Sequence, residues 1–354
     1  MNYLKALTML SQAVSGPDYV LGGGGNTSVK DDNTLWIKPS GTVLGALSEK
    51  DFVALKRERL SELNAVDETM ERQAREREIQ RILTAAKCDV PSDRRPSVEA
   101  PLHHLIEHRF VAHTHPTLVN GMTCSKNGRE TCSELFPDAL WIDFVDPGFM
   151  LYREARERIG QYRDLHDSFP ETIFLKNHGV AISGDSPKRV QDAYRRIFHT
   201  LTEQYRKAGI PLTLPAKEGC PASYARELEN ALRQSVSAPA ETIVSDFFEV
   251  APGPLTPDYI VYAGAFAYVG WPDRAGFREF RHRHGSEPRI VAAPSAVAAL
   301  GDTASKARLA LALARDGALA AQLARAFGGV ETMSGSARAF IEGWEAEHYR
   351  SKLA

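Results

Sequence analysis

The stretch Phe110-Val111-Ala112-His113-Thr114-His115-Pro116 joins an apolar segment to two histidines that are two residues apart. We expect residues 110–115 to form a strand, in which residues i and i+2 point to the same face. His113 and His115 would then present two imidazoles side by side, which is half of a tetrahedral metal site. An H-x-H pair is also compatible with two separate, hydrogen-bonded histidines, so the metal interpretation needs a third ligand from a neighbouring element.

His178 is the natural candidate for that third ligand. It lies in Lys176-Asn177-His178-Gly179, directly after an apolar segment that we expect to be a strand or part of a hairpin over 172–183. Gly179 would let the backbone turn sharply past a metal. Three histidines with an open fourth position suit catalytic Zn²⁺, and imidazole also suits other divalent metals. A second H-x-H, His282-Arg283-His284, lies in a basic, helix-like segment and is interpreted as surface.

Glu99 follows Pro96-Ser97-Val98 at the start of a helix expected over 97–108, shortly before the histidine strand. A carboxylate in the first turn of a helix has two interpretations. It can cap the helix by accepting from backbone N–H groups, or it can act as a catalytic base beside the metal.

Leu21-Gly22-Gly23-Gly24-Gly25-Asn26-Thr27-Ser28 is the most distinctive loop, because consecutive glycines let backbone N–H groups approach an anion closely. It is not a dinucleotide fingerprint, since Thr27 stands where the third glycine should be and a helix rather than a strand precedes it. No Walker Gly-Lys-Ser/Thr sequence is present. Pro39-Ser40-Gly41 forms a second small-residue corner, and each corner by itself is also compatible with a plain turn.

Composition excludes several classes. The 354 residues are 43% hydrophobic and 25% charged, which is typical of a packed globular chain. Lys+Arg number 43 against 45 Asp+Glu, a net charge of −2 that argues against nucleic-acid binding. No apolar run reaches the length of a membrane span, and residues 2–14 read as an amphipathic helix rather than a signal peptide. Four scattered cysteines predict a reducing, cytoplasmic environment without disulfides.

Local patterns predict the remaining organisation. We expect a helix from Ser48 to about Leu60, and a long amphipathic helix from Ser186 to Gly209. Residues 211–221 contain three prolines and a glycine, so we place a domain boundary there. The predicted domains are residues 1–210 and 222–354. In the second, the expected elements are strands at 259–263 and 289–293 and helices at 304–327 and 340–353.

Five short motifs then occur in order along the chain: Gly25-Asn26-Thr27-Ser28, Pro39-Ser40-Gly41, Pro96-Ser97-Val98-Glu99, His113-Thr114-His115-Pro116 and Asn177-His178-Gly179. In this order they resemble the class II aldolase/adducin family over about residues 1–210. The resemblance implies an α/β fold, a three-layer αβα domain around a mostly antiparallel central sheet, with a small C-terminal α/β unit added.

The resemblance also implies roles for eight residues: metal ligation by His113, His115 and His178, acid–base catalysis by Glu99, and binding of a substrate phosphate by Asn26, Ser40, Gly41 and Ser97. Val98 departs from the serine that is commoner in the family, which removes one hydroxyl but keeps a backbone N–H. No tyrosine lies between His115 and Tyr152, so the family's tyrosine proton donor has no counterpart that we can assign.

Two later segments, Leu255–Tyr262 (LTPDYIVY) and Phe340–Arg350 (FIEGWEAEHYR), resemble the region after the aldolase domain in bifunctional rhamnulose-1-phosphate aldolase/lactaldehyde dehydrogenase proteins. The chain stops there, and no G-x-G-x-x-G follows a strand. We therefore expect the aldolase portion without the dehydrogenase half.

The implied function is a zinc-dependent aldolase that cleaves a ketose 1-phosphate, such as rhamnulose 1-phosphate, to dihydroxyacetone phosphate and an aldehyde. Bound Zn²⁺, or another divalent metal, would stabilise the negative charge left on the former carbonyl oxygen. The alternatives are a decarboxylase or epimerase of the same superfamily, and a non-catalytic scaffold as in adducins. Glu99 disfavours the epimerases, which normally carry Asp there. The expected partner is a small-molecule sugar phosphate, with no nucleic acid and no membrane, and the resemblance implies a homo-oligomer such as a tetramer.

Overall fold

The computed structural model describes residues 2–88, 94–215, 219–238 and 240–345. These residues group into two compact units, and neither unit is one continuous stretch of chain. The first falls within Met1–Pro116 and Cys132–His199, and the second within Thr117–Thr131 and Thr200–Lys352. The chain therefore leaves the first unit after Pro116 and returns to it at Cys132.

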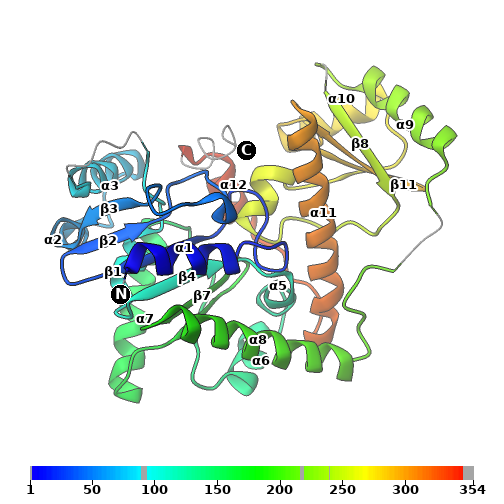
Figure 1. Cartoon of the computed structure of the whole chain (residues 1–354). Coiled ribbons are helices and arrows are strands. Elements are labelled where there is room, and N and C mark those ends of the chain that lie inside the picture. The colour runs from blue at the N-terminus through cyan, green and yellow to red at the C-terminus, as the bar shows by residue number, and fades with distance from the viewer. Residues whose placement is uncertain (1, 89–93, 216–218, 239, 346–354) are drawn as a thin grey trace. The chain divides into compact units, whose positions relative to one another are not determined.

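The first unit is built on a seven-stranded sheet with the strand order β3-β2-β1-β4-β7-β6-β5 (Figure 1). Its strands are β1 (Asn26–Lys30), β2 (Thr34–Ile37), β3 (Val53–Lys56), β4 (Phe110–Thr114), β5 (Leu140–Ile142), β6 (Thr172–Leu175) and β7 (Gly179–Gly184). Every neighbouring pair is antiparallel except β5 and β6, which run parallel. The predicted mostly antiparallel sheet is confirmed.

Helices cover both faces of this sheet. On one face, Ser11 of α1 (Tyr3–Ala13) contacts Thr27 of β1, and Tyr194 of α8 (Pro187–Lys207) contacts Thr114 of β4. On the opposite face, the apolar side chains of the strands form the core with three helices, which are α3 (Arg72–Ala86), α4 (Ala100–Leu105) and α7 (Phe149–His166). Two helical layers therefore enclose one sheet, which is the three-layer arrangement that the resemblance implies. The smaller helical elements are η1 (Leu44–Ala46), α2 (Arg57–Leu60), η2 (Ser61–Ala65) and α6 (Gly128–Leu135).

The second unit contains a four-stranded sheet of order β8-β11-β10-β9. Its strands are β8 (Glu241–Asp246), β9 (Tyr268–Val269), β10 (Ile290–Ala293) and β11 (Ala296–Gly301). Its helical elements are α5 (Thr117–Thr123), α9 (Ala222–Ser235), η3 (Tyr259–Ala263), α10 (Arg274–His284), α11 (Ala304–Ala324), η4 (Arg325–Phe327) and α12 (Gly335–Glu342). A core that includes Leu228 of α9, Phe277 of α10 and Val291 of β10 joins helices to sheet. The predicted small α/β unit is confirmed.

The expected helix from Ser48 to Leu60 is wrong. The chain forms strand β3 first, and only Arg57–Leu60 is helical. Within Val53–Lys56, Val53 and Leu55 are buried while the residues between and after them are more exposed, which is the two-residue period of a strand. Pairing of Leu55 with Leu35 of β2 satisfies that period better than a helix would.

The expected strand at Tyr259–Ala263 is also wrong, because these five buried residues form a π-helical turn, η3. A short apolar run cannot by its periodicity distinguish a buried strand from a buried helix. The hydroxyl of Thr256 accepts a hydrogen bond from the N–H of Tyr259 at 3.3 Å, which favours a turn at this point.

Several other predicted elements are found. The predicted strand at 289–293 is β10, and the predicted helix at 304–327 is α11 followed by η4. α8 ends near Gly209, which has a positive φ of 69°. Of the predicted 340–353 helix, α12 covers 340–342, while 346–354 lie outside the described residues. Cys88, Cys124, Cys132 and Cys220 all lie among the described residues and are thiols rather than halves of disulfides. Among the described residues, no helix combines the length and apolar character that a membrane span requires.

Candidate metal centre

His113, His115 and His178 bring their side chains together in the first unit, and each has one ligand nitrogen within 4.8 Å of the others. The Nε2 atoms of His113 and His115 are 3.0 Å apart, and those of His113 and His178 are 3.4 Å apart. His113 is fully buried, and the other two are at most 8% exposed. The sequence prediction placed the first two on one strand face. In the structure, β4 ends at Thr114 and His115 is the next residue.

The turn between β6 and β7 aims His178 at the other two histidines. Asn177 adopts a left-handed conformation, with φ of 50°, and supplies the reversal that we had expected from Gly179. Gly179 is needed for a different reason. A Cβ at this position would lie 2.3 Å from the carbonyl oxygen of Thr114 and 2.8 Å from the ring of His115, so only glycine lets β7 approach this closely.

The tautomer of His113 is fixed by the neighbouring strand. Its Nδ1 lies 3.1 Å from the carbonyl oxygen of Val180 in β7, and a carbonyl can only accept, so Nδ1 carries the proton. The lone pair of neutral His113 is then on Nε2, which faces the other imidazoles. A backbone carbonyl that orients a ring in this way is the usual support for a metal-ligating histidine.

Glu99 lies beside the three imidazoles and is 6% exposed. Its Oε2 is 3.4 Å from Nε2 of His113, and its Oε1 is 3.7 Å from Nε2 of His178. Glu99 is the residue that precedes α4, yet its side chain makes no capping hydrogen bond to that helix. The capping interpretation is therefore not supported, and the carboxylate is turned toward the histidines instead.

Asn26 holds this carboxylate by donating from Nδ2 to Oε2 of Glu99 at 2.6 Å. Burial raises the pKa of Glu99, but the positive charges that His113 and His178 carry when protonated, together with the Asn26 hydrogen bond, outweigh burial and lower the pKa to about 2. Positive charge at the position of the imidazoles therefore keeps Glu99 ionised.

The donor set fits a divalent cation. Three imidazole nitrogens that face one another at 3.0–3.4 Å need a proton or a metal ion between their lone pairs. Oε1 of Glu99 is buried and, among the described residues, has no hydrogen-bond partner. Three histidines and a carboxylate in a site of low exposure are the ligand types that Zn²⁺ and related metals select.

The segments that carry Ser40 and Ser97, two of the residues implied to bind phosphate, lie next to each other. Pro39 and Pro96 form an isolated antiparallel bridge, so the segments around them pair. The N–H of Ser40 donates to the carbonyl of Arg95 at 2.9 Å, and the N–H of Ser97 donates to the carbonyl of Lys38 at 3.1 Å. The structure therefore brings Ser40 and Ser97 together, with Gly41 following Ser40 at a positive φ of 78°.

Lys38 is a residue of this site that the sequence prediction missed. It is 2% exposed, and its Nζ donates to the carbonyls of Gly23 and Gly25 at 2.9 and 2.8 Å. The glycine loop thus turns two carbonyls toward a buried ammonium group. The signal in the sequence was a lone lysine after the apolar Leu35-Trp36-Ile37, directly before Pro39-Ser40-Gly41.

The second H-x-H behaves differently. His282 and His284 lie at the end of α10, where His282 is exposed and the ring of His284 packs between Phe266 and Phe280 at 4.5 Å from each. Its interpretation as a surface motif agrees with this placement.

Comparison with known proteins gives a family match over the first part of the chain. Residues 5–202 match the model of the Class II Aldolase and Adducin N-terminal domain. An uncharacterized oxidoreductase of Bacillus subtilis is 25% identical over 175 residues, which are 46% of this chain and 24% of that protein. An L-fuculose phosphate aldolase of Methanococcus vannielii is 41% identical over 49 residues, which are 14% of this chain and 27% of that protein. The chain thus spans about a quarter of the length of these curated relatives.

Among solved structures, the N-terminal class II aldolase domain of a conserved protein from Thermoplasma acidophilum is similar, with a TM-score of 0.48 and 24% identity. The match covers 56% of this chain and 92% of that one.

Proposed function

This chain belongs to the class II aldolase and adducin family, and from that premise we propose that it is a metal-dependent aldolase acting on a ketose 1-phosphate. The observation that carries the proposal is the buried cluster of His113, His115 and His178 with the carboxylate of Glu99 beside it. A scaffold without chemistry has no need to bury three imidazoles around one point, because buried polar groups are costly unless they are satisfied.

The proposed substrate class rests on two supports. The bridge between Pro39 and Pro96 brings Ser40, Gly41 and Ser97 to one place, where we propose that they bind the substrate phosphate. Asn26, the fourth residue proposed to bind phosphate, donates to Glu99. L-fuculose phosphate aldolases are among the relatives of the matched region, and the resemblance of the later segments suggests rhamnulose 1-phosphate. Both name a ketose 1-phosphate, whose cleavage yields dihydroxyacetone phosphate and an aldehyde.

The proposed metal ligands are His113, His115 and His178, and Zn²⁺ or another divalent metal fits this set. When bound there, a divalent cation would act as a Lewis acid toward the substrate's carbonyl and hydroxyl oxygens.

The role proposed for Glu99 follows from its ionised state and its fixed position. In the condensation direction, the carboxylate removes a proton from the carbon next to the carbonyl of dihydroxyacetone phosphate, and that carbon then forms the bond to the aldehyde. In cleavage the bond to the aldehyde carbon breaks, and the hydroxyl on that carbon releases its proton as the aldehyde carbonyl forms. Glu99 takes up one proton and delivers it to the carbon that the aldehyde has left, so one proton is released and one is consumed. Asn26 keeps the carboxylate aimed at this position. The group that handles the hydroxyl proton is not assigned.

Two further expectations accompany the proposal. By resemblance the enzyme is a homo-oligomer such as a tetramer, which its mass in solution would test. We also propose that residues 1–210 form the class II aldolase/adducin domain and that residues 222–354 form a C-terminal α/β extension.

The test combines metal content with turnover. Wild type, His113→Ala and the control His282→Ala are assayed for bound metal and for release of dihydroxyacetone phosphate from L-rhamnulose 1-phosphate and L-fuculose 1-phosphate. We expect about one metal per chain and cleavage in wild type and His282→Ala, with both lost in His113→Ala. If the protein binds metal but cleaves neither substrate, decarboxylation substrates and other ketose phosphates are the next to assay. A chain that binds no metal even when zinc is added would be a scaffold.

A further inference from the structure

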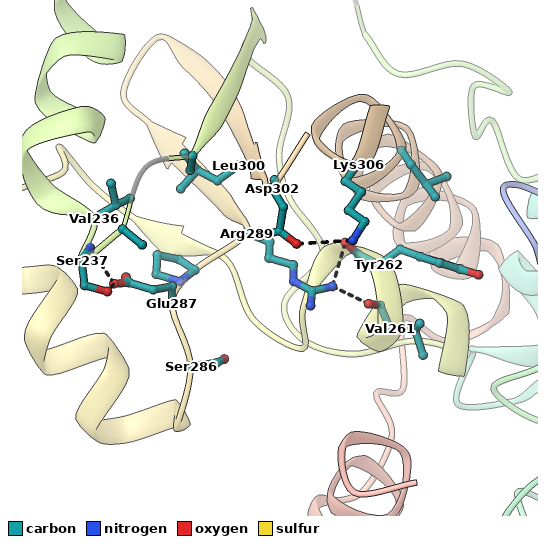
Figure 2. Close-up of a pocket in the computed structure, with 15 residues that line it drawn as sticks. Val236, Ser237, Val261, Tyr262, Ser286, Glu287, Arg289, Leu300, Asp302 and Lys306 are labelled. Atoms are coloured by element: carbon teal, nitrogen blue, oxygen red, sulfur yellow. Dashed lines mark hydrogen bonds and ion pairs between the residues drawn. The ribbon is translucent and has the colours of Figure 1, made fainter. Parts of the chain in front are cut away.

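The second unit contains a cavity of about 410 Å³ that the catalytic proposal does not use (Figure 2). It lies where β11 ends and α11 begins, and is bordered by the loops that lead into β8 and β10. Its volume is within the range of small-molecule sites, which are about 300–1,000 Å³. All of the residues that line it belong to the second unit.

One wall of this cavity carries charge. Figure 2 shows the ammonium of Lys306 joined to the carboxylate of Asp302, and the guanidinium of Arg289 joined to the carbonyls of Val261 and Tyr262. The Nζ of Lys306 lies 3.3 Å from Oδ2 of Asp302. The remaining lining includes the apolar Val261, Leu300 and Leu309 and the polar Ser237, Ser286 and Glu287.

Arg289 is anchored and still has donors to spare. Its Nη1 donates to the carbonyls of Val261 and Tyr262 at the end of η3. Among the described residues, neither its Nε nor its Nη2 makes a hydrogen bond. Arg289 is an exposed residue overall, and burial of part of its side chain lowers the pKa of the guanidinium from its usual range. A guanidinium held in this way presents two parallel N–H groups, the arrangement that matches a carboxylate or a phosphate.

Lys306 is restrained only weakly. Its partner Asp302 is 88% exposed, and the pair has i,i+4 spacing at the start of α11. An exposed ion pair of this kind contributes little to stability. An incoming anion can therefore replace the Asp302 carboxylate at Lys306 at small cost.

Part of the cavity wall comes from the segment Leu255–Tyr262. Val261 and Tyr262 belong to Leu255–Tyr262, the segment that resembles other proteins but has no part in the proposed catalysis. It folds as the buried π-helical turn η3, and such turns are frequent at functional sites.

We propose that the second unit carries its own binding site for a small organic anion in this cavity. The anionic end group lies between Arg289 and Lys306, and the apolar body lies against Val261, Leu300 and Leu309. All residues of the proposed site belong to the second unit, whereas His113 and Glu99 belong to the first.

The test uses three probes that share an apolar body, namely n-butyl phosphate, pentanoate and butan-1-ol. Binding is measured by calorimetry and by saturation-transfer NMR. We expect at least one of the two anions to bind and butan-1-ol not to bind. The preferred anion then identifies the end group as a phosphate or a carboxylate.

Substitutions should shift this affinity in opposite directions. Lys306→Gln should weaken anion binding about tenfold, as expected for loss of a charged hydrogen bond, whereas Asp302→Asn should strengthen it at least twofold because a competing carboxylate is gone. Arg289→Lys keeps the positive charge but removes the paired N–H groups of the guanidinium. A merely structural role of these residues would not produce tighter binding in Asp302→Asn.

The matched control is Lys188→Gln with Asp192→Asn, another exposed i,i+4 lysine–aspartate pair, on α8. These variants and His113→Ala should bind the anions as wild type does. Three results would overturn the proposal: neither anion binds, butan-1-ol binds as well as the anions, or affinity is equal in wild type, Lys306→Gln and Asp302→Asn. If butyl phosphate binds only in the first unit, its affinity will be equal in wild type, Lys306→Gln and Asp302→Asn, which is the third of these results.

Discussion

Nδ2 of Asn26 lies 2.6 Å from Oε2 of Glu99, which joins the first residue of β1 to the residue that precedes α4. The same oxygen is 3.4 Å from Nε2 of His113. The orientation of the carboxylate therefore depends on strand β1, 73 residues away in the chain, and not on its own helix. This makes the position of the proposed base a property of the tertiary fold.

The same face of β1 holds α4 at two further points. Oγ of Ser28 is 2.7 Å from Nδ1 of the buried His103, and Nζ of Lys30 donates to the carbonyls of Ile106 and His108 at 2.6 and 2.9 Å. Residues 26, 28 and 30 point to one face because side chains alternate along a strand. They contact residues in and beside α4 that are spaced about one helical turn apart. Glu99 therefore lies at one end of a row of three polar contacts.

Replacement of Glu99 by glutamine should separate metal binding from catalysis. Glutamine keeps the size of the side chain and an oxygen for contact but cannot take up the proton. We expect about 10²- to 10⁴-fold slower cleavage, the usual contribution of a general acid–base group, with wild-type metal content measured by elemental analysis. Glu107→Gln, an exposed change just beyond α4, is the control. Full activity in Glu99→Gln would remove this residue from the proposed mechanism.

Loss of the Ser28 hydroxyl should loosen the row that positions Glu99. Ser28→Ala leaves His103 without its described partner inside the core, which costs about 1–3 kcal/mol of stability. We expect kcat to fall about tenfold with little change in KM, because substrate binding does not involve this pair. Ser28→Thr, which retains the hydroxyl, should restore kcat. If alanine and threonine variants share the same kcat, the contact serves only stability.

Sequence patterns predicted this site best where its geometry is local. The two-residue period of β4 placed His113 and His115 near each other, and the hairpin of β6 and β7 placed His178 at the end of a strand. The motifs in order identified Glu99 as more than a helix cap. Each of these predictions depended on residues that are neighbours in the chain or that share a motif.

The parts that could not be predicted depend on contacts between distant segments. The bridge from Pro39 to Pro96, which brings Ser40 and Ser97 together, joins segments 57 residues apart in the chain. The buried lysines Lys30 and Lys38 resembled ordinary charged residues, because nothing local reveals that backbone carbonyls surround their Nζ atoms. For η3 the local signal was misleading, since an all-apolar run has no period to read.

Lys38→Met should expose the role of the buried ammonium group. Methionine has a similar length but cannot donate, so the carbonyls of Gly23 and Gly25 lose the donor that holds them. We expect a loss of stability on the order of 3 kcal/mol and a rise in KM for the phosphorylated substrate, because the loop next to Asn26 is no longer fixed. Urea unfolding and initial-rate kinetics measure the two effects.

Lys50→Met, on an exposed turn, is the control for loss of a positive charge. A Lys38→Met protein with wild-type stability would show that the loop does not depend on these two hydrogen bonds. A wild-type KM in a destabilised variant would restrict Lys38 to a structural role.

Acid should destabilise the protein through two histidines around α4. Burial, followed by the charges of Arg57 and Lys30, lowers the pKa of His104 to about 4, and burial lowers that of His103 to about 3. In the unfolded chain both titrate near 6.5. Between pH 6.5 and 4 the unfolded state therefore binds more protons than the folded state, so stability is greatest above pH 6.5 and falls as the pH drops toward 4. Each histidine contributes up to about 1.4 kcal/mol per pH unit to this slope.

His104→Gln should flatten that slope, because glutamine takes up no proton in either state. Urea unfolding of metal-free wild type and variant at pH 6.5, 5.5 and 4.5 measures the difference, and chelation removes any contribution from metal release. His282→Gln on the exposed end of α10 should keep the wild-type slope. The low pKa of Asp51, about 2, affects stability only below about pH 4, outside this window. Parallel slopes in wild type and His104→Gln would mean that His104 is protonated in the folded protein.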